Sequence, residues 1–144
     1  MDFPDGFKRI ECGVFAHCPS LRTIQLPDKL EKVGINCFNG SGIEDIVFPA
    51  STKEICAWAF QYCRSLRSVQ LNDGLETLGK KVGICGRKYQ GHVFHLSTIQ
   101  SIRLPHTLKR IEDYMFGLCQ NLRSIEIPSG VEYIGGNCFQ LSGI

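Results

Sequence analysis

The side chains of this sequence that could do chemistry are eight cysteines and four histidines. His17 and Cys18 are adjacent, and a base beside a thiol is the arrangement that activates a nucleophile. However, Cys18, Cys63 and Cys119 each follow a phenylalanine by three residues and precede a leucine by three. A catalytic cysteine would not recur three times in one setting. We therefore expect these cysteines to be small buried hydrophobic residues, with no catalytic role.

The sequence contains no motif that indicates a metal site, a cofactor site or a set of disulfides. The sequence has no Cys-x-x-Cys pair, and the spacing of Cys85, His92 and His95 matches no common type of metal site. It also lacks a Gly-rich phosphate loop and a His-Glu-x-x-His motif. We expect a protein that is not an enzyme, with no cofactor, no metal and reduced thiols of the cytoplasmic type.

Composition limits the classes of partner. The 144 residues are 43% hydrophobic and 21% charged, which is typical of one folded domain. The net charge of +2 gives no strong attraction to nucleic acid, so we expect no nucleic-acid partner. The apolar runs are too short for a membrane span, and the N-terminal residues do not have the layout of a signal peptide.

The chain consists of repeats, and it forms one predicted domain over residues 1–144. Five of its six prolines begin successive units, and Asn72 takes the place of the missing one. The units start at Pro4, Pro27, Pro49, Asn72, Pro105 and Pro128, so the intervals are 23, 22, 23, 33 and 23 residues. Apolar residues recur at fixed offsets, as in Ile10, Phe15, Cys18, Leu21, Ile24 and Leu26 of the first unit. Such a period predicts a solenoid of stacked coils around a continuous core.

Each unit is expected to contain a strand and a turn. The spacing Leu21-x-x-Ile24-x-Leu26 predicts a short strand, which the following proline ends. The preceding stretch has few β-branched residues and suggests a helical turn. Its phenylalanine should stack on its counterpart in the next coil and form an aromatic spine. The spine would consist of Phe15, Phe38, Phe60, Phe94, Phe116 and Phe139.

Three recurring elements, L-x-x-I-x-L-P, F-x-x-C-x-x-L and F-x-x-S-G-I, together resemble the BspA-like class of leucine-rich repeats. Proline stands where commoner leucine-rich repeats have an Asn or Cys ladder, which favours this class. The resemblance covers all six units. It implies an α/β-type, β-rich, right-handed solenoid with short parallel strands on the concave face and helical turns or irregular coil on the convex side. It also implies proteins of the cell surface or secreted proteins that act in adhesion and are not enzymes.

The default binding surface of such a solenoid is its concave sheet, where a protein or peptide would lie. The outward positions of the strands are Arg22, Gln25, Glu44, Val47, Arg67, Gln70, Gln100, Arg103, Arg123 and Glu126. The alternative is that these residues only pair across strands and keep the sheet soluble. The whole chain would then be a structural spacer within a longer surface protein.

The long fourth unit is a second, weaker candidate for binding a partner. Its insertion, about residues 79–93, carries Lys80, Lys81, Arg87, Lys88 and Tyr89. These residues could bind an acidic partner or a phosphate backbone, or they could form a solvated loop.

Both ends of the sequence fall inside a repeat. Ile144 occupies the position of Ile43 and Ile99, where a strand element begins. We therefore expect either a fragment of a longer array or a short member that covers its ends by end-to-end self-association.

Overall fold

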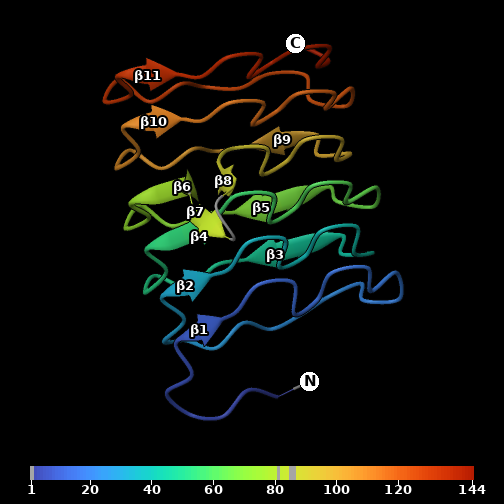
Figure 1. Cartoon of the computed structure of the whole chain (residues 1–144), viewed down its shortest axis with the longest axis vertical. Helices are drawn as coiled ribbons and strands as arrows, with labels where there is room; N and C mark the ends of the chain where they lie inside the picture. Colours follow the sequence, from blue (N-terminus) through green and yellow to red (C-terminus); the bar gives the residue numbers. More distant parts are fainter. Residues whose placement is uncertain (1, 81, 85–86) are drawn as a thin grey trace.

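The computed structural model describes residues 2–80, 82–84 and 87–144. The chain winds into a column of stacked coils, with its two ends at opposite ends of the column (Figure 1). Buried apolar side chains from every coil form one continuous core. The predicted solenoid is therefore confirmed.

Two parallel sheets run along the column. The first sheet consists of β1 (Arg9–Ile10), β2 (Lys32–Val33), β4 (Glu54–Cys56) and β6 (Thr77–Lys80). The second sheet consists of β3 (Asp45–Val47), β5 (Ser68–Gln70) and β9 (Ser101–Ile102). A further parallel pair is formed by β10 (Arg110–Ile111) and β11 (Tyr133–Ile134).

The second sheet lies where strands were predicted. In β3, β5 and β9 the apolar residue points into the core and its neighbours point outward. In the fifth unit the same segment contributes a single bridge, between Arg103 and Glu126. The first sheet was missed, because its strands are two to four residues long. One buried residue among charged ones, as in β1, gives no alternating pattern to detect.

The expected helical turn is wrong, since no residue of the described ranges is helical. Instead, the residues two before and two after each of the six predicted spine phenylalanines have positive φ, as in Trp58 (62°) and Tyr62 (59°) around Phe60. We call such a five-residue segment, here residues 58–62, a Phe turn. The left-handed residues aim alternate N–H groups at the next coil. The N–H of Phe60 donates to the carbonyl of Val93 at 2.8 Å, and that of Tyr62 donates to His95 at 3.0 Å.

The predicted aromatic spine is confirmed. The six rings stack in sequence order, with centroids 5.2–5.7 Å apart and planes within 12° of parallel. The rings of Phe38, Phe60, Phe94 and Phe116 are fully buried. This spacing is close to the roughly 4.8 Å between neighbouring strands of a sheet. One ring per coil therefore fills the core without altering the rise of the coils.

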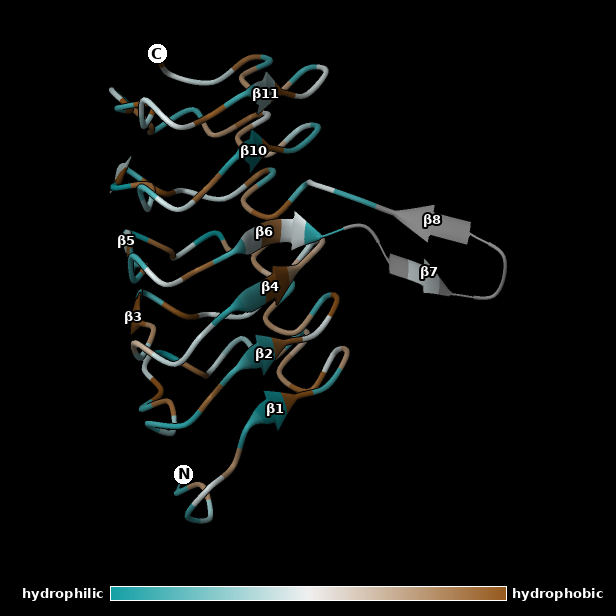
Figure 2. Ribbon diagram, turned by 90° about the vertical axis from the view of Figure 1, so that its left-hand side faces the viewer, coloured by the Kyte–Doolittle hydropathy of each residue, from teal (hydrophilic) through white to brown (hydrophobic). Residues whose placement is uncertain are grey.

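An antiparallel hairpin, β7 (Val82–Ile84) and β8 (Arg87–Tyr89), leaves the column between β6 and the fourth Phe turn. Its base is closed by the N–H of Gly91, which donates to the carbonyl of Gly79 at 2.9 Å. Gly91 has φ of 68°, and a Cβ there would lie 2.0 Å from the carbonyl oxygen of Asp113. The hairpin leaves the column at the end of β6, on the side opposite to β3 and β5 (Figure 2), so it leaves the second sheet uncovered.

Truncating the spine should strongly destabilise the protein. We expect Phe60→Ala to lower the free energy of unfolding by about 3–5 kcal/mol, because it leaves a cavity between two stacked rings. Phe60→Leu should cost less, and Arg64→Ala on the surface should cost under about 0.5 kcal/mol. Urea unfolding followed by circular dichroism measures all three. A cost below about 1 kcal/mol for Phe60→Ala would contradict the role of the spine.

Substitutions at a residue with positive φ should change the stability of the protein according to how well the new side chain tolerates that backbone conformation. Tyr62 is 43% exposed with φ of 59°, so its backbone conformation can be tested with little loss of packing. We expect Tyr62→Val to be less stable than Tyr62→Asn by about 1–2 kcal/mol, because β-branched residues resist positive φ and Asn tolerates it. Arg64 is exposed and has no positive φ, so Arg64→Val and Arg64→Asn form the matched control. An equal difference at both positions would show that the strain is not the cause.

Candidate functional site

The ten predicted binding residues lie along the outer face of the second sheet and its extension in the first and fifth coils. Nine are exposed and Glu44 is partly buried. The strand register places Asp45 beside Ser68 and Ser68 beside Ser101. In the same way Val47 lies beside Gln70, and Arg103 is bridged to Glu126. Residues of one repeat position therefore form columns parallel to the solenoid axis.

The middle column is made of small side chains, and long side chains flank it. Its members are Thr23, Asp45, Ser68, Ser101 and Ser124. We call this surface the sheet groove. It contains two cavities, a lower hollow of about 660 Å³ beside β3 and an upper hollow of about 700 Å³ over β5 and β9. The lower hollow is the one nearer to the N-terminal end of the column.

Arg67 pairs with two carboxylates of the preceding coil. Its Nη2 donates to Glu44 Oε2 at 2.8 Å and to Asp45 Oδ2 at 2.9 Å. Ser68 donates to Asp45 Oδ1 at 2.7 Å, and this bond, together with those from Arg67, lowers the pKa of the Asp45 carboxyl. Arg22 approaches Glu44 at 3.6 Å. These residues do pair across strands, which is the part of the alternative interpretation that the structure shows.

The other polar residues of the groove differ in whether their side chains are hydrogen-bonded. Arg103 is held by Asp73, with contacts of 3.0 and 2.9 Å. In contrast, no described residue forms a side-chain hydrogen bond or ion pair with the following four: Gln25, Gln70, Gln100 and Arg123. The groove therefore offers amide and guanidinium groups that no described residue engages.

The first sheet has a different surface, because its charged side chains pair with one another. Glu54 contacts Lys32 at 2.6 Å and Lys80 at 2.5 Å. The hydrogen bond to Glu54 raises the pKa of Lys32 despite its partial burial. Lys8 and Glu31 form a similar pair at 2.7 Å. Lys80, predicted as an insertion-loop contact, is thus engaged in an ion pair with the column.

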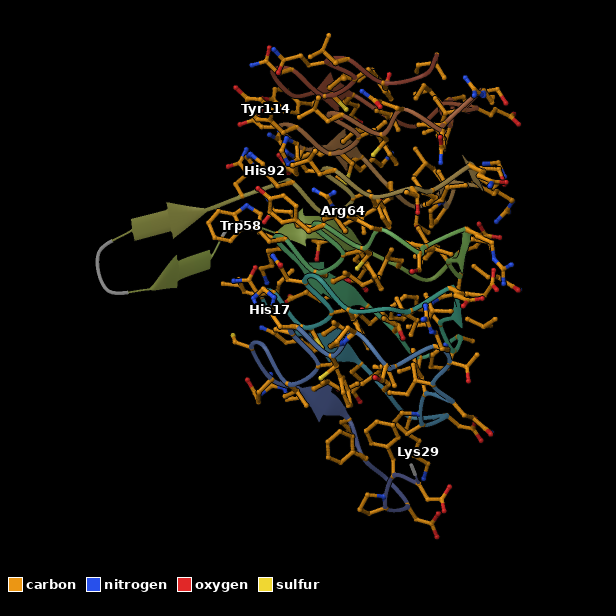
Figure 3. All side chains as sticks on the ribbon, turned by 90° about the vertical axis from the view of Figure 1, so that its right-hand side faces the viewer. His17, Lys29, Trp58, Arg64, His92 and Tyr114 are labelled. Atoms are coloured by element: carbon orange, nitrogen blue, oxygen red, sulfur yellow. The ribbon has the colours of Figure 1, made fainter. Side chains whose placement is uncertain are left out.

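The other predicted insertion contacts cannot be placed as side chains. Lys81 lies outside the described residues, as do the side chains of Arg87, Lys88 and Tyr89, although the backbone of the last three forms β8. Near the base of the hairpin, Trp58, His92 and Tyr114 lie on successive Phe turns (Figure 3). The His92 ring stacks on Tyr114 with centroids 4.6 Å apart. Sequence reasoning missed this cluster, because its register depends on the Phe turns.

The histidines of the fourth unit lie together, but Cys85 lies outside the described residues. His92 and His95 have ring centroids 5.2 Å apart, and burial, followed by the charge of His92, lowers the pKa of His95. Within the described part of the chain, no group of three His, Cys, Asp or Glu side chains could hold a metal ion. That part also contains no helix with the length and apolar character needed to cross a membrane.

Of the three recurring cysteines, Cys63 and Cys119 are buried thiols as expected, and Cys18 is only partly buried. Cys63 and Cys119 are fully buried, and each donates to the carbonyl of a spine phenylalanine, Phe38 at 3.0 Å and Phe94 at 2.9 Å. Burial raises the pKa of both thiols to about 11. A nucleophilic cysteine needs a lowered pKa. The seven described cysteines are all free thiols.

Comparisons with known proteins agree with the geometry. A family described as BspA type leucine rich repeat region matches residues 1–82 and 87–144, in six copies. No curated protein matches the chain. A leucine-rich repeat protein from Bacteroides ovatus has a similar structure, with a TM-score of 0.84 and 32% identity over 99% of this chain and 35% of that one.

Two further solved structures are similar at lower scores. The leucine rich repeat protein of T. pallidum has a TM-score of 0.58 and 28% identity, covering 96% of this chain and 50% of that one. A leucine rich cell surface protein from Faecalibacterium prausnitzii has a TM-score of 0.55 and 26% identity, covering 92% of this chain and 36% of that one. The chain thus spans between a third and a half of the length of these structures.

The buried thiols should resist modification until the protein unfolds. We expect Cys37, Cys56, Cys63, Cys119 and Cys138 to remain unmodified by an alkylating reagent at pH 8 in the native state. Burial raises their pKa values to between about 11 and about 12, so little thiolate is present and access is blocked. The exposed Cys12 should react first. Mass spectrometry of peptides, with and without denaturant, measures each site. Native labelling of Cys63 as fast as Cys12 would contradict the structure.

Proposed function

Because the chain belongs to the BspA-type leucine-rich repeat family, we propose that it is a non-catalytic recognition module. Its fold is a leucine-rich repeat solenoid, typically a scaffold for protein interactions. The module binds an extended segment of a protein in the sheet groove, which we expect to be the concave face of the solenoid. The observation that carries this proposal is the groove itself, with its small central column and uncommitted polar groups.

The groove suits a polypeptide main chain. The hydroxyls of Ser101 and Ser124 can both donate and accept, as can the amides of Gln70 and Gln100, while Ser68, which donates to Asp45, can accept. Small side chains in the central column let a backbone approach the sheet. Five coils at about 4.8 Å give each column a length of about 20 Å, which corresponds to about six residues of extended chain.

The first sheet is a poorer candidate, because its ion pairs would have to be broken before a partner could bind. One structural neighbour is described as a cell surface protein. We propose accordingly that the module acts in recognition or adhesion at a surface, as one part of a longer repeat array. In the alternative, the chain is a spacer with no ligand of its own.

Filling the groove should abolish binding. A displayed library of random peptides is selected on the protein, and the enriched peptides are then synthesised and titrated by fluorescence anisotropy. We expect Ser101→Arg to weaken their binding at least about 10-fold, because a long charged side chain replaces a small one in the central column. Ser129→Arg is the matched control, since Ser129 is exposed and lies outside the residues that line both hollows.

Thermal unfolding of both variants checks that they fold. The proposal fails if no peptide is enriched over an empty support, which is the result expected of a spacer. It also fails if the folded Ser101→Arg variant binds the enriched peptides as tightly as the unmodified protein.

A further inference from the structure

The lower hollow is acidic, although the protein carries a net charge of +2. Asp2, Asp28 and Asp45 line it, and no lysine or arginine does. The upper hollow is lined by Arg103 and Glu126, so its charges balance. The two halves of the sheet groove therefore differ in charge as well as in position.

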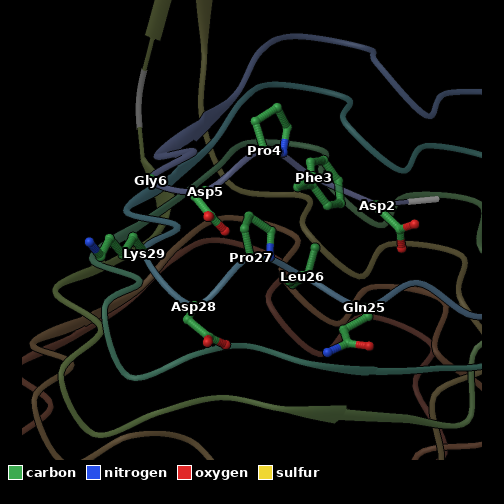
Figure 4. A pocket seen from close by; sticks show the side chains of 10 residues that line it. All are labelled: Asp2, Phe3, Pro4, Asp5, Gly6, Gln25, Leu26, Pro27, Asp28 and Lys29. Atoms are coloured by element: carbon green, nitrogen blue, oxygen red, sulfur yellow. The ribbon is translucent and has the colours of Figure 1, made fainter.

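A neighbouring cavity extends the acidic region. It has a volume of about 480 Å³ and shares Asp2, Gln25, Leu26 and Asp28 with the lower hollow. It adds the carboxylate of Asp5, and its single base is Lys29. The Lys29 ammonium is directed away from the carboxylates of Asp5 and Asp28 (Figure 4).

Three of these carboxylates have no cationic partner. Asp45 is bonded to Arg67, but Asp2, Asp5 and Asp28 form no ion pair with any of the described residues. Each of the three is exposed. A partner's cation placed among them would gain charge-assisted hydrogen bonds without displacing an existing pair.

The walls of the hollow are apolar. Val47 is 58% exposed in the row beside the central column, although its counterpart Gln70 in the next coil is polar. Pro49 and the partly buried Ile24 complete the wall. An aliphatic wall below a carboxylate rim matches a side chain with a methylene stem and a cationic head, which describes lysine and arginine.

We propose that the lower hollow receives a lysine or arginine side chain of the bound segment. This inference rests on the proposed function and specifies its partner: an extended segment with a basic residue at the end that lies over β3. The apolar wall contacts the stem of that residue, and Asp28 attracts its charged head. The balanced upper hollow takes the neutral remainder of the segment.

The experiment uses the peptides enriched on the sheet groove. We expect most of them to contain a lysine or arginine at one fixed position. Asp28→Asn should weaken such a peptide about 3- to 10-fold in 50 mM salt, and the loss should shrink in 0.5 M salt because the contact is exposed. A synthetic copy with methionine in place of the basic residue should bind the protein and Asp28→Asn equally. Glu76→Gln, an exposed site that lines neither hollow, is the control.

The outcomes separate this inference from the proposed function. Enriched peptides without a fixed basic residue, or equal binding to Asp28→Asn, would overturn the inference. If Ser101→Arg still abolished binding in that case, the sheet groove would remain the binding site. If Ser101→Arg had no effect either, both proposals would fail.

Discussion

The structure depends on one shared spacing between coils. Each phenylalanine of the spine must stack on the ring of the next coil while the backbone around it bonds to the same coil. The ring centroids are 5.2–5.7 Å apart, and the accompanying N–H to carbonyl distances are close to 3 Å. A coil that rose by more would lose both contacts together. This explains why one unit can carry an inserted hairpin and still keep its phenylalanine in register, since the chain returns to the column beside its point of departure, at Gly79 and Gly91.

The Phe turn links the spacing of the coils to the register of the two sheets. Its left-handed residues turn the chain sharply, so the strand before it joins the first sheet and the strand after it joins the second. Because alternate N–H groups of the turn bond to the next coil, the turn also fixes the register of both sheets. The columns of the sheet groove are thus set by buried contacts elsewhere in the coil. The exposed residues of the groove make little contribution to the fold, and their identities can vary at small cost.

Sequence reasoning found what is repeated and missed what depends on backbone conformation. The period, the spine and the strands at Asp45–Val47 and Ser68–Gln70 all follow from apolar residues at fixed offsets. The Phe turn was mistaken for a helical turn, because residues such as Trp58 and Leu118 give no hint of positive φ. The assumption that the strands stack in register was enough to assign the predicted groove residues to one face. It did not reveal which of them were paired, since Arg103 bonds to Asp73 of another segment.

The division of charge between the sheets follows from the same register. In parallel strands, residues at one repeat position become neighbours, so alternating lysine and glutamate at one position makes a chain of ion pairs. In the first sheet Lys32 lies beside Glu54 at one position and pairs with it, and Lys80, from outside that position, pairs with the same carboxylate. In the second sheet Arg22, Glu44 and Arg67 alternate and pair, but Gln100 interrupts this row before Arg123, and Ser68, Ser101 and Ser124 follow Asp45 in the neighbouring column. A broken alternation leaves charge and hydrogen-bonding capacity unmatched within the chain. That unmatched capacity is concentrated on the uncovered sheet, where another molecule can satisfy it.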